Sequence, residues 1–247
     1  MAKQTKGYCK YCGKEYTRGG MLRHLAACGA RKAALAEEKG KRTCGYYELV
    51  LSGKYNKAYW LIVEIREDAL LEDLDRFIRD IWVECCGHLS AFQIGGTEYE
   101  SHPSGDSLWG PPARSMAVML RRVLSVGMVF SYEYDFGSTT ELEIKVQDYR
   151  SGRIWKREKI TVLSRNNPPE ILCSQCGERP AEWVNPEGYY DGNPFWCEEC
   201  RKEAQEGETE DEYAESFFLP VCNSPRMGVC GYEGSEKYPD QFLPDHQ

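Results

Sequence analysis

The sequence predicts an α+β fold, in which a middle domain with an antiparallel sheet and packed helices is flanked by two small cysteine-rich modules. Strand-like and helix-like segments alternate without the strand–helix–strand rhythm of a parallel sheet. Cysteines occur as C-x2-C pairs near both ends of the chain. A length of 247 residues with 41% hydrophobic content suits one medium domain with attached modules.

The first module, residues 1–44, is predicted to be a ββα unit. Residues 8–16 suggest a short hairpin with Gly13 near its tip. Gly19-Gly20 then precedes a predicted helix that runs from about Met21 into Ala36. A basic linker closes the module.

The middle domain, residues 45–165, is predicted to be mostly sheet. Its candidate strands are rich in β-branched and aromatic residues, and glycine-containing turns separate them. Gly95-Gly96 is the predicted turn of one hairpin. The predicted strands are 47–51, 59–65, 92–94, 97–99, 129–136, 141–149 and 159–163.

Two helices and one loop complete the predicted middle domain. Apolar residues from Leu70 to Trp82 recur at helical spacing, with Asp68 as the candidate N-cap. Residues 101–114 are rich in proline and glycine and predict a loop. Residues 116–124 predict a short helix.

The last module, residues 166–247, contains the second pair of cysteine motifs. An acidic stretch at 203–215 is expected to be solvated. The segment 217–232 is apolar enough to predict that it packs back onto another part of the protein.

The net charge of −8 is unevenly distributed. Residues 1–44 carry 11 Lys and Arg against 3 Asp and Glu, a net of +8, and the remainder carries 20 against 36, a net of −16. Two interpretations remain open. The basic end could contact a polyanion, or it could be an ordinary solvated helix.

The N-terminal spacing C-x2-C-x11-H-x3-C predicts a zinc finger. Zinc prefers four tetrahedral nitrogen and sulfur ligands, and a C-x2-C turn supplies two of them. Residues four apart on a helix share one face and supply the other two. The predicted ligands are Cys9, Cys12, His24 and Cys28.

The C-terminal spacing C-x2-C-x20-C-x2-C predicts a four-cysteine zinc ribbon. Four thiolates close the coordination sphere, so this ion would be structural. The alternative, redox-active C-x-x-C motifs, favours a thioredoxin-like context that the sequence lacks. The predicted ligands are Cys173, Cys176, Cys197 and Cys200, which gives two structural zinc ions per chain.

The other cysteines are given no metal role. We expect Cys222 and Cys230 to be buried thiols, and the adjacent Cys85 and Cys86 to be packing residues. Cys44 lies in the linker and is assigned no function.

No catalytic residue is predicted. The triplet Asp135-Phe136-Gly137 lacks the companion motifs of a kinase. His88 and His102 are expected to be ordinary polar or capping residues. The carboxylates that could pair in the sheet are Glu133, Asp135, Glu141 and Glu143.

Residues 46–149 resemble the plasmid open-reading-frame-three-like family. The resemblance rests on Tyr47-Glu-Leu-Val-Leu51, Trp60, Leu70–Leu74, Ile81-Trp82, His88-Leu89, Phe92–Gly96, Tyr99 and Tyr132-Glu-Tyr-Asp-Phe-Gly137. Many members follow that glycine with an acid and a tryptophan, whereas this chain has Ser138-Thr-Thr-Glu141. The tail at 223–232 is also similar to that of zinc-bearing relatives. The resemblance implies an α+β middle domain and an association with plasmids or mobile elements.

The first functional hypothesis is a non-enzymatic, zinc-stabilised binding protein. DNA or RNA is the candidate ligand of the basic finger, and a protein is a candidate partner of the middle domain. The predicted phosphate contacts are Arg18, Arg23, Arg31 and Lys32.

Two alternatives stay open: a protein-interaction adaptor with purely structural zinc modules, and an enzyme that acts on nucleic acid through an acidic site in the middle domain. The N-terminus lacks an apolar leader, and the longest apolar run, at 58–63, is far too short for a membrane helix. We therefore expect a cytoplasmic location and no membrane partner.

Overall fold

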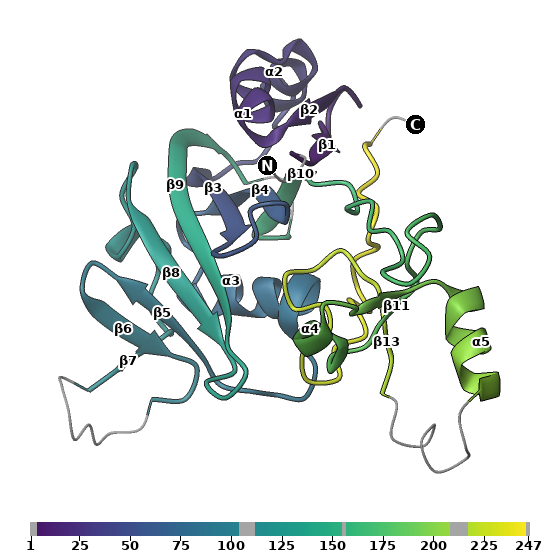
Figure 1. The fold of residues 1–247 in the computed structure, drawn as a ribbon. Coiled ribbons are helices and arrows are strands. Elements are labelled where there is room, and N and C mark those ends of the chain that lie inside the picture. The colour runs from purple at the N-terminus through teal and green to yellow at the C-terminus, as the bar shows by residue number, and fades with distance from the viewer. Residues whose placement is uncertain (1–3, 104–111, 155–156, 208–216, 246–247) are drawn as a thin grey trace.

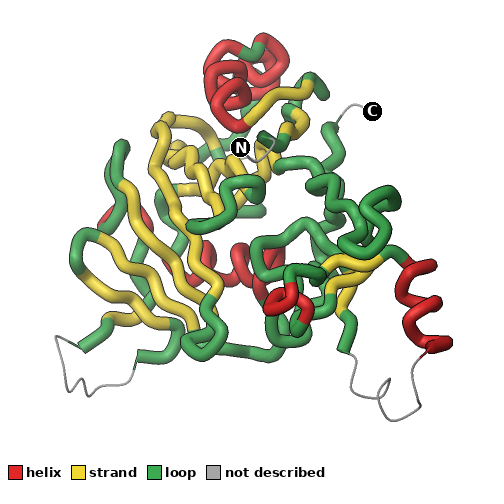
Figure 2. Tube along the Cα trace, in the orientation of Figure 1, coloured by secondary structure: helices red, strands yellow, loops and turns green. Residues whose placement is uncertain are grey.

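A computed structural model describes residues 4–103, 112–154, 157–207 and 217–245. The N-terminal finger lies at the top of Figure 1, above a large sheet, and the C-terminal segments lie beside that sheet. Figure 2 shows that strands and irregular loops dominate over helices. Within the described ranges, every helix is too short or too polar to span a lipid bilayer.

The finger begins with an antiparallel hairpin of β1 (Lys6–Tyr8) and β2 (Glu15–Thr17). The single helix predicted from Met21 into Ala36 is wrong, because two helices, α1 (Arg18–Ala27) and α2 (Gly29–Ala36), replace it. Cys28 separates them with an extended backbone, at φ −61° and ψ 114°. Gly29, a poor helix former, follows the break.

Within the described residues, eight strands form the central sheet in the order β10-β4-β3-β9-β8-β5-β6-β7. All its pairings are antiparallel except that of β6 with β7. The strands are β3 (Thr43–Gly53), β4 (Trp60–Arg66), β5 (Ser90–Ile94), β6 (Thr97–Glu100), β7 (Arg114–Ser115), β8 (Val129–Tyr134), β9 (Thr140–Arg153) and β10 (Ile160–Arg165). This arrangement confirms the predicted α+β class and the predicted strands.

The amphipathic helix is present but begins later and changes type. It consists of α3 (Leu71–Ile78), followed directly by a π-helical turn, η1 (Arg79–Val83). Asp68 is not its N-cap. The Asp68 carboxylate instead accepts two hydrogen bonds from Arg66, at 2.8 and 2.6 Å, while Asp73 accepts one from the Leu70 amide at 2.7 Å.

The short helix predicted at 116–124 shrinks to a 3-10 turn, η2 (Leu120–Arg122). Met116 and Leu120 are both buried in the main core, so their helix-like spacing reflects burial of an irregular segment. The predicted loop at 101–114 falls largely on residues 104–111, which lie outside the described residues.

Strands β3 and β4 are buried on both faces. One face, with Leu49, Leu61 and Val63, packs in the main core together with α3 and η1. The opposite face, with Trp60 and Ile62, packs in a second core with residues of the finger. The finger is therefore docked on the sheet.

The C-terminal segment contains a three-stranded sheet in the order β12-β11-β13. Its elements are β11 (Trp183–Val184), α4 (Gly188–Asp191), β12 (Phe195–Trp196), α5 (Glu198–Gly207) and β13 (Leu219–Pro220). The predicted docking of the tail is confirmed, because the Ser224 hydroxyl donates a hydrogen bond to the Trp82 carbonyl at 2.5 Å. Most of the acidic stretch at 203–215 lies outside the described residues.

Candidate metal centres and a basic groove

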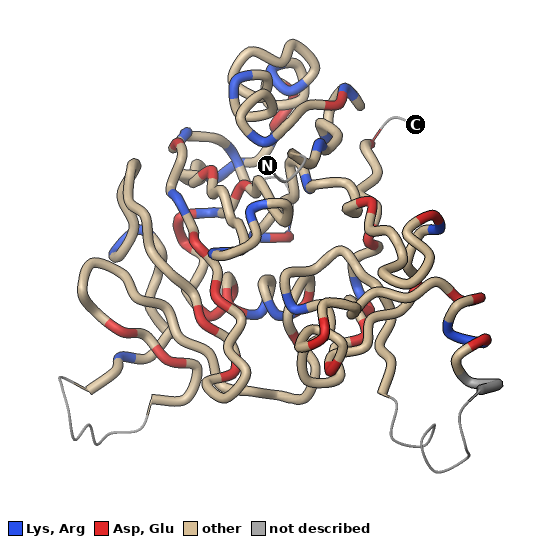
Figure 3. The backbone as a smooth tube through the Cα atoms, viewed as in Figure 1, with Lys and Arg blue, Asp and Glu red and all other residues tan. Residues whose placement is uncertain are grey.

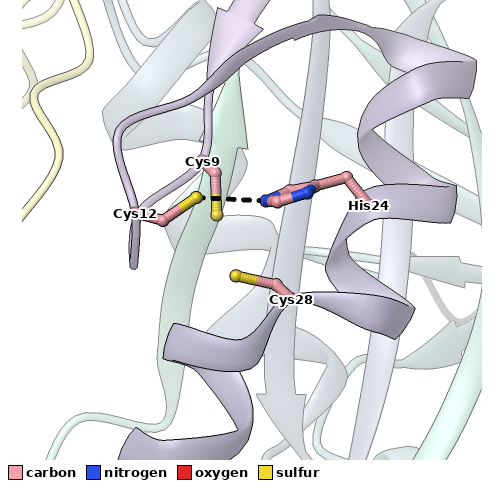
Figure 4. Close-up of side chains that lie close together, drawn as sticks. All are labelled: Cys9, Cys12, His24 and Cys28. Atoms are coloured by element: carbon pink, nitrogen blue, oxygen red, sulfur yellow. Dashed lines mark hydrogen bonds between the residues drawn. The ribbon is translucent and has the colours of Figure 1, made fainter.

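The first cluster brings together the four ligands predicted in the finger (Figure 4). Cys9 and Cys12 come from the turn after β1, His24 from α1, and Cys28 from the break between α1 and α2. Their ligand atoms all lie within 4.8 Å of one another, and Cys12 Sγ is 3.2 Å from His24 Nε2. This set can hold a metal ion.

The helix break sets the geometry of this cluster. The spacing predicts His24 and Cys28 on one face of a continuous helix, but Cys28 lies beyond the end of α1. Tyr16 stacks on the His24 ring, with centroids 4.5 Å apart and an interplanar angle of 24°. Met21 and Leu25 are buried beneath the cluster, against the sheet.

The second cluster brings together the four predicted ribbon cysteines, with all four sulfurs within 4.8 Å. Cys173 and Cys176 belong to a tight turn that ends in Gly177, which has φ +71° and donates its amide to the Cys173 carbonyl at 2.9 Å. Cys197 follows β12 and Cys200 lies in α5. A turn and a helix start thus present two facing pairs of thiols.

The thiols of this cluster influence each other's ionisation. Backbone amides of Arg179 and Glu178 lower the pKa of Cys176 to about 6. The Arg179 guanidinium lowers the pKa of Cys200, but burial and the neighbouring thiols outweigh it and raise that pKa to about 12. Crowded thiolates repel one another, and a bound cation removes that repulsion.

A third cluster, of Cys85, Cys86, His88 and Cys230, was missed by the sequence argument. Cys86 and Cys230 are exposed and Cys85 is half-buried, so the expectation that Cys230 is a buried thiol is wrong. Cys222, in contrast, is buried as predicted. The run Cys-Cys-x-His was a usable signal, but the fourth member lies 142 residues beyond His88.

The predicted phosphate contacts separate into two groups. Arg23 and Lys32 are exposed, and Arg18 is half-buried. Arg31 is buried, and its guanidinium pairs with Glu48 at 2.9 Å and Glu64 at 3.1 Å. The structure therefore does not present Arg31 to solvent.

A groove of about 710 Å³ lies between the start of α1 and the turn that joins β3 to β4. Arg18, Arg23 and Lys57 supply its charged lining, and Tyr55 and Trp60 are its aromatic lining residues. No Asp or Glu lines it among the described residues. Glu143 lies at its margin, where its carboxylate accepts from Lys57 at 2.9 Å.

The carboxylates considered for a catalytic site are partly engaged. Asp135 is buried and pairs with Arg226 at 2.8 Å, which lowers the pKa of its carboxyl against the effect of burial. Glu141 accepts hydrogen bonds from Lys54 and Tyr55. These contacts tie Asp135 and Glu141 to basic or hydroxyl groups.

Comparison with known proteins adds a family to these geometric findings. A solved structure of a protein of unknown function, MM3350, from Methanosarcina mazei Go1 shows a TM-score of 0.40 and 19% sequence identity, covering 48% of this chain and 68% of that one. A search of curated proteins gave no match. The family model described as Plasmid pRiA4b ORF-3-like protein matches residues 48–176, more than half of the chain. By this match, which spans the sheet and reaches the first ribbon cysteines, the chain belongs to the plasmid pRiA4b ORF-3-like family.

Proposed function

We propose that this protein is a non-enzymatic, zinc-stabilised nucleic-acid-binding protein associated with plasmids or mobile elements. The observation that carries the proposal is the groove lined by three basic side chains and, among the residues that the structure describes, by no acidic one. The family match supports the genetic association, since the family takes its description from a plasmid protein.

Zinc is the metal that best fits the two predicted clusters. Thiolate and imidazole donors in groups of four match its preference for tetrahedral sulfur and nitrogen ligands. Each cluster supplies all four ligands from the protein, which leaves no coordination position for a substrate. Both ions would therefore stabilise the fold without catalysing a reaction.

The groove suits a phosphate backbone. Arg18 and Arg23 project from α1, and Lys57 faces them from the β3–β4 turn. Figure 3 shows several Lys and Arg positions on the finger at the top of the molecule, and others on the sheet below it. Contacts of this kind position a nucleic acid without reading its sequence. Lys32, exposed on α2 outside the groove, would be a peripheral contact.

The test uses the full-length protein and labelled duplex DNA, single-stranded DNA and RNA. Replacing both Arg18 and Arg23 with glutamine should weaken binding to all sequences alike. It should reduce the slope of log affinity against log salt by about 2, roughly one for each lost phosphate contact. Lys32→Gln should have a smaller effect on affinity.

A matched control changes the same amount of charge outside the groove. Lys39 and Lys41 are exposed in the linker, and their double glutamine variant should retain most of the affinity and salt slope. If the wild-type protein binds none of the three nucleic acids at low salt, the proposal fails and the adaptor hypothesis replaces it. Equal losses of affinity in the two double variants would show that the groove is not the binding site.

A further inference from the structure

We propose that Cys85, Cys86, His88 and Cys230 bind a third structural zinc ion, which fastens the C-terminal tail to the central sheet. The first three residues lie in the segment between η1 and β5, and Cys230 lies in the tail. All four ligand atoms lie within 4.8 Å of one another. This site goes beyond the proposed function and does not depend on nucleic-acid binding.

The spacing of the donor atoms approaches that of a zinc tetrahedron. With Zn–S near 2.3 Å and Zn–N near 2.0–2.1 Å, two sulfurs should be about 3.8 Å apart and a sulfur and nitrogen roughly 3.6 Å apart. The sulfur of Cys86 is 3.6 Å from that of Cys85 and 3.9 Å from that of Cys230. His88 Nε2 is 2.9 Å and 3.3 Å from the same Cys86 and Cys230 sulfurs, so a small outward shift of the ring completes the geometry.

A buried carboxylate lies beside the second ring nitrogen of the proposed histidine ligand. Asp135 Oδ1 lies 3.6 Å from His88 Nδ1, on the side of the ring away from the sulfurs. Metal-binding histidines almost always direct their second ring nitrogen to such an acceptor, which fixes the tautomer and the ring plane. Asp135 is therefore a positioning residue for this site.

Asp135 is itself held firmly. Arg226, fully buried, donates to its other carboxylate oxygen at 2.8 Å, and the Gly137 amide donates to Oδ1 at 3.0 Å. Asp135 adopts φ +66°, a left-handed conformation that is uncommon outside glycine and that marks a position under constraint. Arg226 also donates a hydrogen bond to the Cys85 sulfur at 3.4 Å, which links the residue that holds Asp135 to one of the proposed ligands.

The neighbouring Tyr134 side chain holds the backbone of the segment that carries three of the proposed ligands. The Tyr134 hydroxyl accepts hydrogen bonds from the backbone amides of Cys85, at 3.4 Å, and His88, at 3.3 Å. It donates to Glu84 Oε1 at 2.9 Å. The sequence Tyr-Asp-Phe-Gly at the end of β8 thus positions both the backbone and the imidazole of the site.

Contacts away from the cluster hold the tail in place as well. The Ser224 hydroxyl donates to the Trp82 carbonyl, and the Ser235 hydroxyl donates to the Asp80 carbonyl, each at 2.5 Å. Removing one ligand should therefore leave the tail folded, and the loss of metal can be measured in folded protein.

The test is the metal content of the full-length protein, purified without added metal and measured by elemental analysis and native mass spectrometry. The wild type should hold three zinc ions per chain. Cys230→Ser and His88→Ala should each hold two. Cys230→His, which restores a zinc ligand, should return the count towards three. Cys44→Ala, which removes a thiol outside all three clusters, should keep three.

A measurement of metal affinity tests whether Asp135 positions His88 or only stabilises the fold. Asp135→Asn should weaken binding of one ion by about 10- to 100-fold in a chelator competition and leave the other two unchanged. Two ions in the wild type, or three in Cys230→Ser, would overturn the proposal. A disulfide between Cys86 and Cys230 in wild-type protein kept under reducing conditions would overturn it too.

Discussion

At the scale of single residues, the finger's arginines have different roles that composition alone does not reveal. Arg23 is exposed, whereas Arg31 is enclosed by two carboxylates of β3 and β4. Arg150 completes this network by pairing with Glu64 at 2.5 Å and Glu38 at 2.9 Å. Losing one partner of a buried ion pair leaves an uncompensated buried charge, so this network opposes displacement of the finger from the sheet.

The buried thiol of Cys222 should make stability decrease at alkaline pH. Burial, with a smaller effect of Asp240, raises its pKa to about 12. As the pH rises, the thiol of the unfolded chain ionises before that of the folded protein. The stability that the protonated Cys222 contributes to the folded state is therefore complete below about pH 9, and it is lost as the pH rises to about 12. Between these limits the wild type should lose up to about 1.4 kcal/mol per pH unit relative to Cys222→Ala.

The measurement is the free energy of unfolding in denaturant, at several pH values from 8 upwards, for both proteins. The difference between them removes the contributions to the pH dependence that the two proteins share, and leaves that of Cys222 together with its effect on the neighbouring Tyr59, Tyr189 and Tyr232. Parallel pH dependences in the two proteins would show that this thiol is not shifted.

At the scale of elements, the longer strands of the central sheet followed from local sequence, whereas the two-residue strands β7, β11, β12 and β13 and the helix ends did not. The hairpin of β5 and β6 could be predicted because Gly95 and Gly96 both adopt positive φ between two alternating segments. The break at Cys28 could not, because α1 packs on the sheet through Met21 and Leu25 while α2 pairs with it through Arg31, and that sheet comes later in the chain. Spacing revealed two metal clusters whose ligands are close in sequence, but not the third, whose Cys230 is brought in by tail packing.

Loss of one ribbon ligand should unfold the ribbon and spare the sheet. In Cys176→Ser the ribbon loses a thiolate from a site of the kind that contributes on the order of 10–16 kcal/mol to small zinc modules. The buried cysteines of the ribbon form a hydrophobic cluster separate from the main core, so the sheet keeps its own stabilising contacts.

Limited proteolysis followed by mass spectrometry checks this expectation. Cleavage in the mutant should be faster within 170–207 and unchanged within 43–154. The Cys44→Ala variant should be digested like the wild type. Equal acceleration in both regions would mean that the ribbon and the sheet unfold as one unit, against the predicted boundary near Asn166.

At the scale of the whole molecule, the central sheet is the platform on which both cysteine-rich ends are assembled. The finger covers one face of β3, β4 and β10, and the tail packs beside η1. The two ends also touch, since Lys10 pairs with Asp245 at 2.5 Å and its carbonyl accepts the Asp245 amide at 3.0 Å.

Replacing Trp60 with alanine should weaken the packing of the finger on the central sheet. Its side chain is 1% exposed in the core shared by the finger and the sheet, and its indole donates to the Thr5 hydroxyl at 3.0 Å. Trp60→Ala should lower the free energy of unfolding by about 3–5 kcal/mol. Hydrogen exchange should increase most in α1 and α2.

The matched control is Tyr190→Ala, which removes a ring that is 92% exposed and should change stability by no more than about 0.5 kcal/mol. Unchanged exchange in α1 and α2 of the Trp60 variant would show that the Trp60 side chain does not hold the finger on the sheet.

The pairing of the finger with β10 has a consequence for biosynthesis. The Lys10 amide donates to the Leu163 carbonyl at 2.9 Å, and the Asn167 amide donates to the Lys6 carbonyl at 2.7 Å. At ribosomal rates of roughly 5–20 residues per second, about 7–28 s separate translation of Cys28 from that of Asn166. The nascent finger must keep its apolar underside, including Met21 and Leu25, away from other chains throughout this interval. If the finger binds a metal early, it is folded before β10, on which it docks, has been translated.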